Sequence, residues 1–229
     1  MPRPPSDRAT TPASRDLARA FDGEFEVVVA DTPELRDASF ALRHEVYCRE
    51  FGFEAVRADG LERDAYDERA RHYLLGHKPT GAWAGSVRVV FAEDTDGEIG
   101  LPFEAAGVRL HNPAPIDLTT LPRASIGEIS RLAVAAPFRR GRHEPSALLG
   151  TALIAVAATA HSGLGSAVCM MKPQLEQQLN TYGIRFTRLS GIVHHRGDRA
   201  LFHVVPHITC RDVRPEFQGI LTAIRSRLS

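Results

Sequence analysis

The stretch Gly127–Val134, GEISRLAV, has the composition of a buried strand, yet it contains two residues suited to acid–base and anion-binding chemistry. Glu128 and Arg131 stand three residues apart in this apolar run, and unpaired buried charges are costly. A carboxylate here can serve as a general base, and a guanidinium can hold another carboxylate in fixed geometry. We expect both residues to be catalytic. The alternatives are ordinary salt bridges at the rim and, for Glu128, a structural ion pair with Arg88 or Arg131.

Strand geometry adds a condition to this hypothesis. Successive side chains of a strand point to opposite faces, so Glu128 and Arg131 diverge unless the backbone is irregular. If both side chains serve one cleft, a β-bulge near residues 129–131 is required. Such a bulge also frees a backbone N–H that can bind a ligand.

Other charged residues precede this stretch. Asp64 and Asp67 lie in the charge-dense segment 52–71 and share one face if that segment is helical. They can bind an ammonium group or order a cover over a cleft, although an acidic pair in a charged loop is often only solvated. Arg88, in a predicted strand, can orient these carboxylates or bind the carboxylate of a substrate, and it is expected to be catalytic. Arg43, on a predicted helix, joins this set, and the co-occurrence favours a functional site.

Apolar and basic side chains complete the candidate set. Phe53, Trp83 and Met170 can line a tunnel for an alkyl chain, while core packing is the alternative for each. Three arginines form a basic patch suited to an acidic protein or a phosphate, or else a solvated loop: Arg139, Arg140 and Arg142. The histidines and the three cysteines lack ligand spacing, so we expect no metal site and no disulfide.

Composition limits the class of protein. The chain has 229 residues with 28 basic and 28 acidic side chains, so no bulk charge favours nucleic acid, and no nucleic-acid partner is expected. Segment 145–171 lacks Lys, Arg, Asp and Glu, but the sequence HSGLG at 161–165 divides it. A buried helix followed by a buried strand is therefore expected rather than stable membrane insertion. The cysteine usage fits a reducing cytosol, and a cytoplasmic location is expected.

The predicted elements form one α/β domain over residues 23–229, after a disordered leader at 1–22 that is rich in Pro, Ser, Thr and Arg. Strands are predicted at 25–30, 72–78, 82–91, 125–135, 166–171, around 192–193 and at 200–205. Helices are predicted at 34–51, 145–160, 173–183 and 215–228. The proline-rich connection 98–123 is expected to wrap the surface. This order predicts a mixed sheet with helices on both faces.

Four segments carry a resemblance to a known family: LRHEVYCREFGF (42–53), ERDAYDERARHYLL (62–75), GSVRVV (85–90) and EISRLAVAAPFRRG (128–141). In this order they resemble the GNAT acyltransferases, and within them the acyl-homoserine-lactone autoinducer synthases and long-chain N-acyl amino acid synthases. Within this branch, the sequence is most similar to the acyltransferases associated with PEP-CTERM/exosortase systems. The resemblance spans residues 25–205 and implies the GNAT fold, with a mixed, mostly antiparallel sheet whose strands at 125–135 and 166–171 splay apart.

The resemblance implies an N-acyltransferase in which an amine attacks an acyl thioester directly. The implied donor is the 4′-phosphopantetheine thioester of acyl carrier protein. Acyl-CoA is the less favoured donor, because RRGRHE has one glycine where acetyl-CoA binders have two. No permanently bound cofactor is implied, and the acceptor is the amine of an amino acid or similar small molecule. By motif, the charged set of the autoinducer synthases falls on Arg43, Asp64, Asp67, Arg88, Glu128 and Arg131.

Two other functions stay open. An acyl-homoserine-lactone synthase would use S-adenosylmethionine as acceptor and would release a lactone. A non-catalytic acyl-binding or regulatory module would keep the fold without turnover. The intact charged set argues against the module.

Overall fold

The strands of the protein follow its β-branched and apolar runs. The structure is a computed structural model that describes residues 12–92, 100–139 and 146–228. Its strands are β1 (Phe25–Val29), β2 (Ala70–His77), β3 (Ala82–Phe91), β4 (Ile126–Val134), β5 (Ser166–Met171), β6 (Thr187–Arg188), β7 (Val193–His194) and β8 (Asp198–Val204). They form one sheet in the order β1-β2-β3-β4-β5-β8-β6, with β7 paired to β8. Only the β4–β5 pair is parallel among the described strands.

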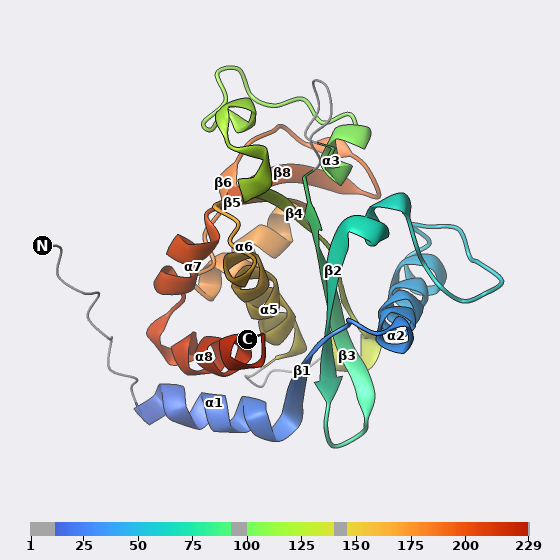
Figure 1. Ribbon diagram of the computed structural model, residues 1–229, viewed down its shortest axis with the longest axis vertical. Coiled ribbons are helices and arrows are strands. Elements are labelled where there is room, and N and C mark those ends of the chain that lie inside the picture. Colours follow the sequence, from blue (N-terminus) through green and yellow to red (C-terminus); the bar gives the residue numbers. More distant parts are fainter. Residues whose placement is uncertain (1–11, 93–99, 140–145, 229) are drawn as a thin grey trace, which may run out of the picture.

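The helices lie on both faces of this sheet. They are α1 (Pro12–Glu24), α2 (Pro33–Arg43), α3 (Pro102–Ala105), α4 (Ala136–Arg139), α5 (Ala147–His161), α6 (Pro173–Thr181), α7 (Pro206–Asp212) and α8 (Gln218–Arg227). Shorter turns are η1 (His44–Glu50), η2 (Ala65–Arg69), η3 (Leu118–Thr120), η4 (Arg123–Ser125) and η5 (Pro215–Phe217). Figure 1 shows α2 on one side of β2 and β3 and α5 with α8 on the other. The expected mixed, mostly antiparallel fold class is confirmed.

The N-terminal segment corrects one expectation. Residues 12–22 belong to α1 rather than to a disordered leader, whereas residues 1–11 lie outside the described part of the chain. The reason is burial on one face: Phe21 is 2% exposed and contacts the glycine position 150 of α5. On the same helix, the Ser14 hydroxyl accepts a hydrogen bond from the Gly219 N–H at 3.0 Å.

Helix α5 occupies the centre of the core. Ser146 caps its first turn by accepting a hydrogen bond from the Leu149 N–H at 3.2 Å. The hydroxyls of Thr151 and Thr159 donate to carbonyls of their own helix, so these polar groups are satisfied although buried. The uncharged segment is thus a buried helix followed by strand β5. None of the helices in the described ranges combines the length and the hydrophobicity needed to cross a bilayer.

Strand β4 contains an irregularity next to the charged residues. Ser86 of β3 is opposite Ala133 while Arg88 is opposite Ser130, so Arg131 and Leu132 together face a single residue of β3. Arg131 has a φ of 53°, in the left-handed region. The bulge predicted near residues 129–131 is therefore present.

Strands β4 and β5 separate beyond this region. They pair only from Ile126–Ser166 to Glu128–Val168. Further along, β4 stays with β3 and β5 stays with β8. The predicted splay is confirmed, and it leaves a cleft between the two strands.

Several boundaries differ from the sequence-based expectation. The first predicted helix changes at His44 from an α-helix to the π-helical turn η1. Helix α7 and strand β6 were not anticipated, because both are short. The connection expected to wrap the surface buries Leu101, Phe103 and Leu118 in a second core cluster against β4 and β8.

Candidate functional site

A cavity of about 900 Å³ lies where β4 and β5 diverge. Apolar side chains from β4, β5 and the helices α5 and α6 form much of its wall, including Ile129, Leu132, Met170, Val156, Leu175 and Leu179. The volume and the apolar wall suit a long alkyl chain. Of the predicted tunnel residues, Phe53 and Met170 line the cavity. The described lining omits Trp83, which packs near Leu42 and Val46 beneath α2.

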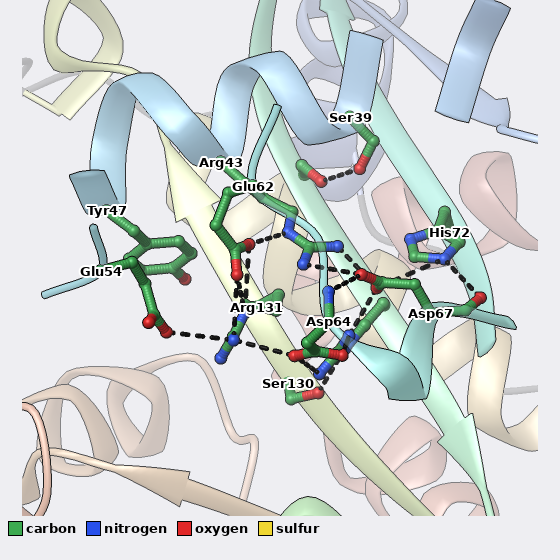
Figure 2. Close-up of polar contacts among 12 residues, drawn as sticks. Ser39, Arg43, Tyr47, Glu54, Glu62, Asp64, Asp67, His72, Ser130 and Arg131 are labelled. Carbon is green, nitrogen blue, oxygen red and sulfur yellow. Dashed lines mark hydrogen bonds and ion pairs between the residues drawn. The ribbon is translucent and has the colours of Figure 1, made fainter. Parts of the chain in front are cut away.

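A network of ion pairs stands beside this cavity, and Figure 2 shows it between α2 and the sheet. Arg43 is fully buried, and its Nε donates to Glu62 at 2.5 Å. The two terminal nitrogens of Arg43 donate to the two oxygens of Asp67 at 2.8 and 3.1 Å. Such a bidentate contact fixes both partners. The helix α2 therefore anchors the segment that follows residue 60.

Arg88 of β3 holds the acidic pair from the sheet side. Its Nη1 and Nη2 donate to the two oxygens of Asp64 at 2.6 and 2.9 Å, and it also contacts Asp67. Its Nε donates to the Ser130 hydroxyl at 3.0 Å. The two aspartates in turn cap η2, because Asp64 accepts from the Tyr66 N–H and Asp67 accepts from the Asp64 N–H. Residues 65–69 thus form a short 3₁₀ helix, with Asp64 as its N-cap and Asp67 in its first turn.

The bulge turns Arg131 toward the same network. Its guanidinium donates to Glu62 at 3.1 Å, to Asp64 at 2.9 Å and to Glu54 at 3.1 Å. Burial lowers the pKa of Arg131, but Glu62 and Asp64 outweigh that effect, so the net pKa is raised. Ser130 and Arg131 also line the cavity. These two residues join the ion-pair network to the cleft.

The acidic pair is ionised in this setting. Burial raises the pKa of Asp67, yet the hydrogen bond and charge of Arg43, with the charge of Arg88, bring the net pKa well below its ordinary value. The pKa of Asp64 is lowered in the same way, against burial, by Arg88 and Arg131. Both carboxylates therefore stay negative at neutral pH and keep the arginines in place.

Glu128 occupies a different environment. It is the last residue of β4 paired with β5, so it sits at the apex of the cleft, and it is 2% exposed. Its carboxylate accepts a hydrogen bond from the Phe103 N–H at 2.8 Å. Burial raises its pKa to about 8. The described cavity lining omits Glu128, and none of its described hydrogen bonds goes to Arg88 or Arg131.

The predicted basic patch is only partly described. Arg139 lines the cavity, forms an ion pair with Glu50 and stacks over Phe51 at 4.9 Å from the ring centroid. Arg140 and Arg142 lie outside the described residues. Within the described ranges no cluster of His, Cys, Asp or Glu has the arrangement of a metal site.

Sequence reasoning missed several members of the site. Glu62 and Glu54 pair with Arg131, and Tyr47 donates from its hydroxyl to the Leu132 carbonyl at 2.6 Å. Tyr47 lies one helical turn after Arg43, a spacing that could have signalled it. Lys172 and Arg199, which also line the cavity, gave no such signal because they are far apart in the chain.

The comparisons with known proteins agree with this architecture. Residues 42–148 match the family model for an acetyltransferase (GNAT) domain. The AHL synthase LasI is similar in structure, with a TM-score of 0.58 and 16% identity over 80% of this chain and 91% of that chain. A CoA-dependent acyl-homoserine lactone synthase, BjaI, solved with SAM and isopentyl-CoA, gives a TM-score of 0.56 and 20% identity over 90% and 89%.

A third similar structure is FeeM, an N-acyl amino acid synthase from uncultured soil microbes. Its TM-score is 0.51 with 12% identity, over 82% of this chain and 94% of that chain. No curated protein sequence matches this chain. Because the sequence identities to these structures are low, the similarity establishes the architecture of the chain and not its substrate. The domain match, the splayed strands and the neighbours together show that this chain has the GNAT fold.

Proposed function

We propose that the protein is an N-acyltransferase that moves a fatty acyl group from acyl carrier protein, or from acyl-CoA, to the amine of an amino acid or similar small molecule. The observation that carries this proposal is the apolar cavity at the divergence of β4 and β5, bordered by the ion-pair network through Ser130 and Arg131. An alkyl chain fits the wall of that cavity, and the bulged strand supplies the irregular backbone needed at a reacting carbonyl.

The reaction is a direct displacement at the thioester. The acceptor nitrogen forms a bond to the carbonyl carbon, the oxygen becomes an oxyanion, and the carbon–sulfur bond then breaks to release the thiol. A backbone N–H freed by the bulge at Arg131 stabilises the oxyanion, and one such donor accelerates acyl transfer by ~100-fold or more. The amine loses its proton to a base and the leaving sulfur gains one.

Glu128 is the proposed base. Its pKa, raised to about 8, makes the ionised form of Glu128 a stronger base than an ordinary carboxylate, so the fraction that is ionised near neutral pH can take the proton from the amine. Because its carboxylate does not line the described cavity, the proton reaches it through a water molecule. Arg88 and Arg131 orient the cleft, and Arg43, Asp64 and Asp67, which were expected to bind substrate, instead fix the segment beside it through their ion pairs.

The finer assignments rest on sequence resemblance. We propose the carrier protein as donor partner, with the loop of Arg139, Arg140 and Arg142 facing its acidic surface or its phosphopantetheine phosphate. A cytoplasmic location and a link to a PEP-CTERM/exosortase system belong to the same proposal. The pairing of Arg139 with Glu50 means that an incoming phosphate must compete with that carboxylate.

A second candidate is an acyl-homoserine-lactone synthase, which similarity to LasI and BjaI favours. Its acceptor would be S-adenosylmethionine, and its product would be a lactone. The two reactions use the same cleft, so the product distinguishes them.

The test is mass spectrometry of lipid extracts from cells that overexpress the protein, beside a Glu128→Gln control. N-acyl amino acids found only with the wild type support the proposal and name acceptor and chain length, whereas acyl-homoserine lactones support the second candidate. Purified protein is then incubated with palmitoyl carrier protein and amino acids. Bound thioester without thiol release in that assay would contradict both enzymes and indicate an acyl-binding module.

A further inference from the structure

The charges around the cavity do not balance. Four arginines and four carboxylates compensate one another in the network described above, once the Arg196–Glu54 pair at 2.5 Å is included: Arg43, Arg88, Arg131, Arg196, Glu54, Glu62, Asp64 and Asp67. Lys172 and Arg199 add two positive charges at the cavity wall, against one negative charge from Glu24, so a net positive charge remains. Among the described residues, no carboxylate lies within 4.0 Å of either one.

The fold brings these two cations to the same aromatic ring. Lys172 follows directly after β5, and Arg199 is the second residue of β8, the strand paired with β5. The Lys172 Nζ is 5.8 Å and the Arg199 Cζ is 5.7 Å from the centroid of the Phe53 ring. Arg199 otherwise donates only weakly, to the Met170 carbonyl at 3.5 Å and to the Arg196 carbonyl at 3.4 Å. Phe53 thus shares its ring with two unneutralised charges.

The local electrostatics favour an anion. Burial lowers the pKa of Arg199, and the charges of Arg196 and Arg131 lower it further against the opposite effect of Tyr47. Burial also lowers the pKa of His195, as do Arg196 and Arg199. Contact with an aromatic ring stabilises a cation by about 0.5–1 kcal/mol but does not neutralise its charge. A negatively charged ligand would relieve this repulsion.

Arg139 differs from these two cations because it has a carboxylate partner. Arg139 stacks on Phe51, whose ring lies 5.2 Å from that of Phe53, yet its guanidinium is already paired with Glu50. The cation over Phe51 is therefore neutralised. The two cations over Phe53 line the cavity without such a carboxylate partner, so a ligand in the cavity can bind them.

We propose that Lys172 and Arg199 bind the carboxylate of the acceptor, so that the acceptor is a carboxylate-bearing amine rather than a simple amine. This inference rests on the proposed acyltransfer function. Phe53 holds the two cations at the wall that Arg131 shares, so a bound carboxylate brings the neighbouring amine toward β4, where the proposed reaction places the thioester carbonyl. A phosphate of the donor has the same charge chemistry, and the experiment separates the two sources.

The experiment compares each standard L-amino acid with its amide, using palmitoyl-CoA and palmitoyl carrier protein as donors and thiol release with mass spectrometry as readout. Wild type is expected to prefer the acid. Lys172→Gln and Arg199→Gln are each expected to reduce the acid-to-amide ratio of kcat/KM by about 10-fold, the usual worth of one charge-assisted contact, with the donor KM unchanged. Lys172 is exposed, so its substitution should not disturb folding.

The sequence offers a matched control, since Lys78 and Lys172 are its only lysines. Lys78 is exposed, and its Nζ contacts the Asp22 carbonyl. Lys78→Gln should leave the acid-to-amide ratio of kcat/KM unchanged with either donor. A wild-type ratio near one would overturn the inference while leaving acyltransfer intact. A variant that raises the KM of palmitoyl-CoA instead assigns the charges to the donor phosphates and also overturns it.

A protein without turnover on any acceptor refutes the proposed function but still tests the anion site. Thermal unfolding is then measured with the same acids and amides. Stabilisation by acids alone, lost in Lys172→Gln and retained in Lys78→Gln, supports the site. Equal effects of acids and amides on wild type overturn it.

Discussion

The buried carboxyl group of Glu128 should control how the stability of the protein depends on pH. Burial raises its pKa from 4.5 to about 8. The unfolded chain releases this proton above about pH 4.5, whereas the folded chain keeps it until about pH 8. The stability that Glu128 contributes is therefore complete below pH 4.5 and is lost as the pH rises toward 8. The loss approaches about 1.4 kcal/mol per pH unit and on the order of 5 kcal/mol in total.

The substitution Glu128→Gln removes the ionisation and keeps the shape. The glutamine carbonyl can accept the hydrogen bond that Phe103 N–H donates at 2.8 Å. Urea unfolding of both proteins at pH 5, 6, 7 and 8 gives the free energy of unfolding at each pH. We expect the variant to gain several kcal/mol over the wild type between pH 5 and pH 8.

A matched control is Glu45→Gln, because the Glu45 side chain is 65% exposed on η1. Its difference from the wild type should stay nearly constant with pH. If the Glu128→Gln and wild-type profiles run parallel, the carboxyl group is already ionised in the folded protein and the reasoning is wrong. That result would also contradict the proposed role of Glu128 as a base with a raised pKa.

Two packing predictions concern the bulged region and its support. Gly85→Ala places a methyl group against the Thr151 hydroxyl of α5 and should destabilise the protein by ~1–3 kcal/mol, while the double variant Gly85→Ala/Thr151→Ala should recover most of the loss in urea unfolding. No recovery would mean that the strand, not this contact, causes the loss. Arg131→Gly and Arg131→Ala both remove the carboxylate contacts, but the glycine variant should be more stable by about 1 kcal/mol because only glycine accepts a φ of 53° without strain. The reverse order in thermal unfolding would contradict the left-handed bulge.

Much of the candidate site could be predicted from residue types and spacing. Arg43, Asp64, Asp67 and Arg88 were expected to act together, and they share one ion-pair network. The bulge followed from a simple conflict, since a regular strand cannot turn Glu128 and Arg131 to one side. Even with the bulge, Glu128 differs from the expectation, because its side chain meets the Phe103 N–H instead of the cavity.

Long-range contacts explain what was missed. Trp83 is a large aromatic residue of the kind that can line a tunnel, but the register of β3 directs it to the cluster beneath α2. The leader was expected to be disordered because it is rich in Pro, Ser and Thr, yet Phe21 of α1 packs on α5. Local composition does not report such burial.

The sequence by itself determined the order of the longer strands and of α2, α5, α6 and α8, the charged residues available for chemistry and the fold class. Those features depend on local periodicity, turn residues and the spacing of charges along the chain. Only the tertiary structure decided which carboxylate each arginine holds and which cations stay unpaired. Lys172 and Arg199 face the same ring because β5 and β8 are neighbours in the sheet, and strand pairing is a long-range choice that neither residue encodes locally.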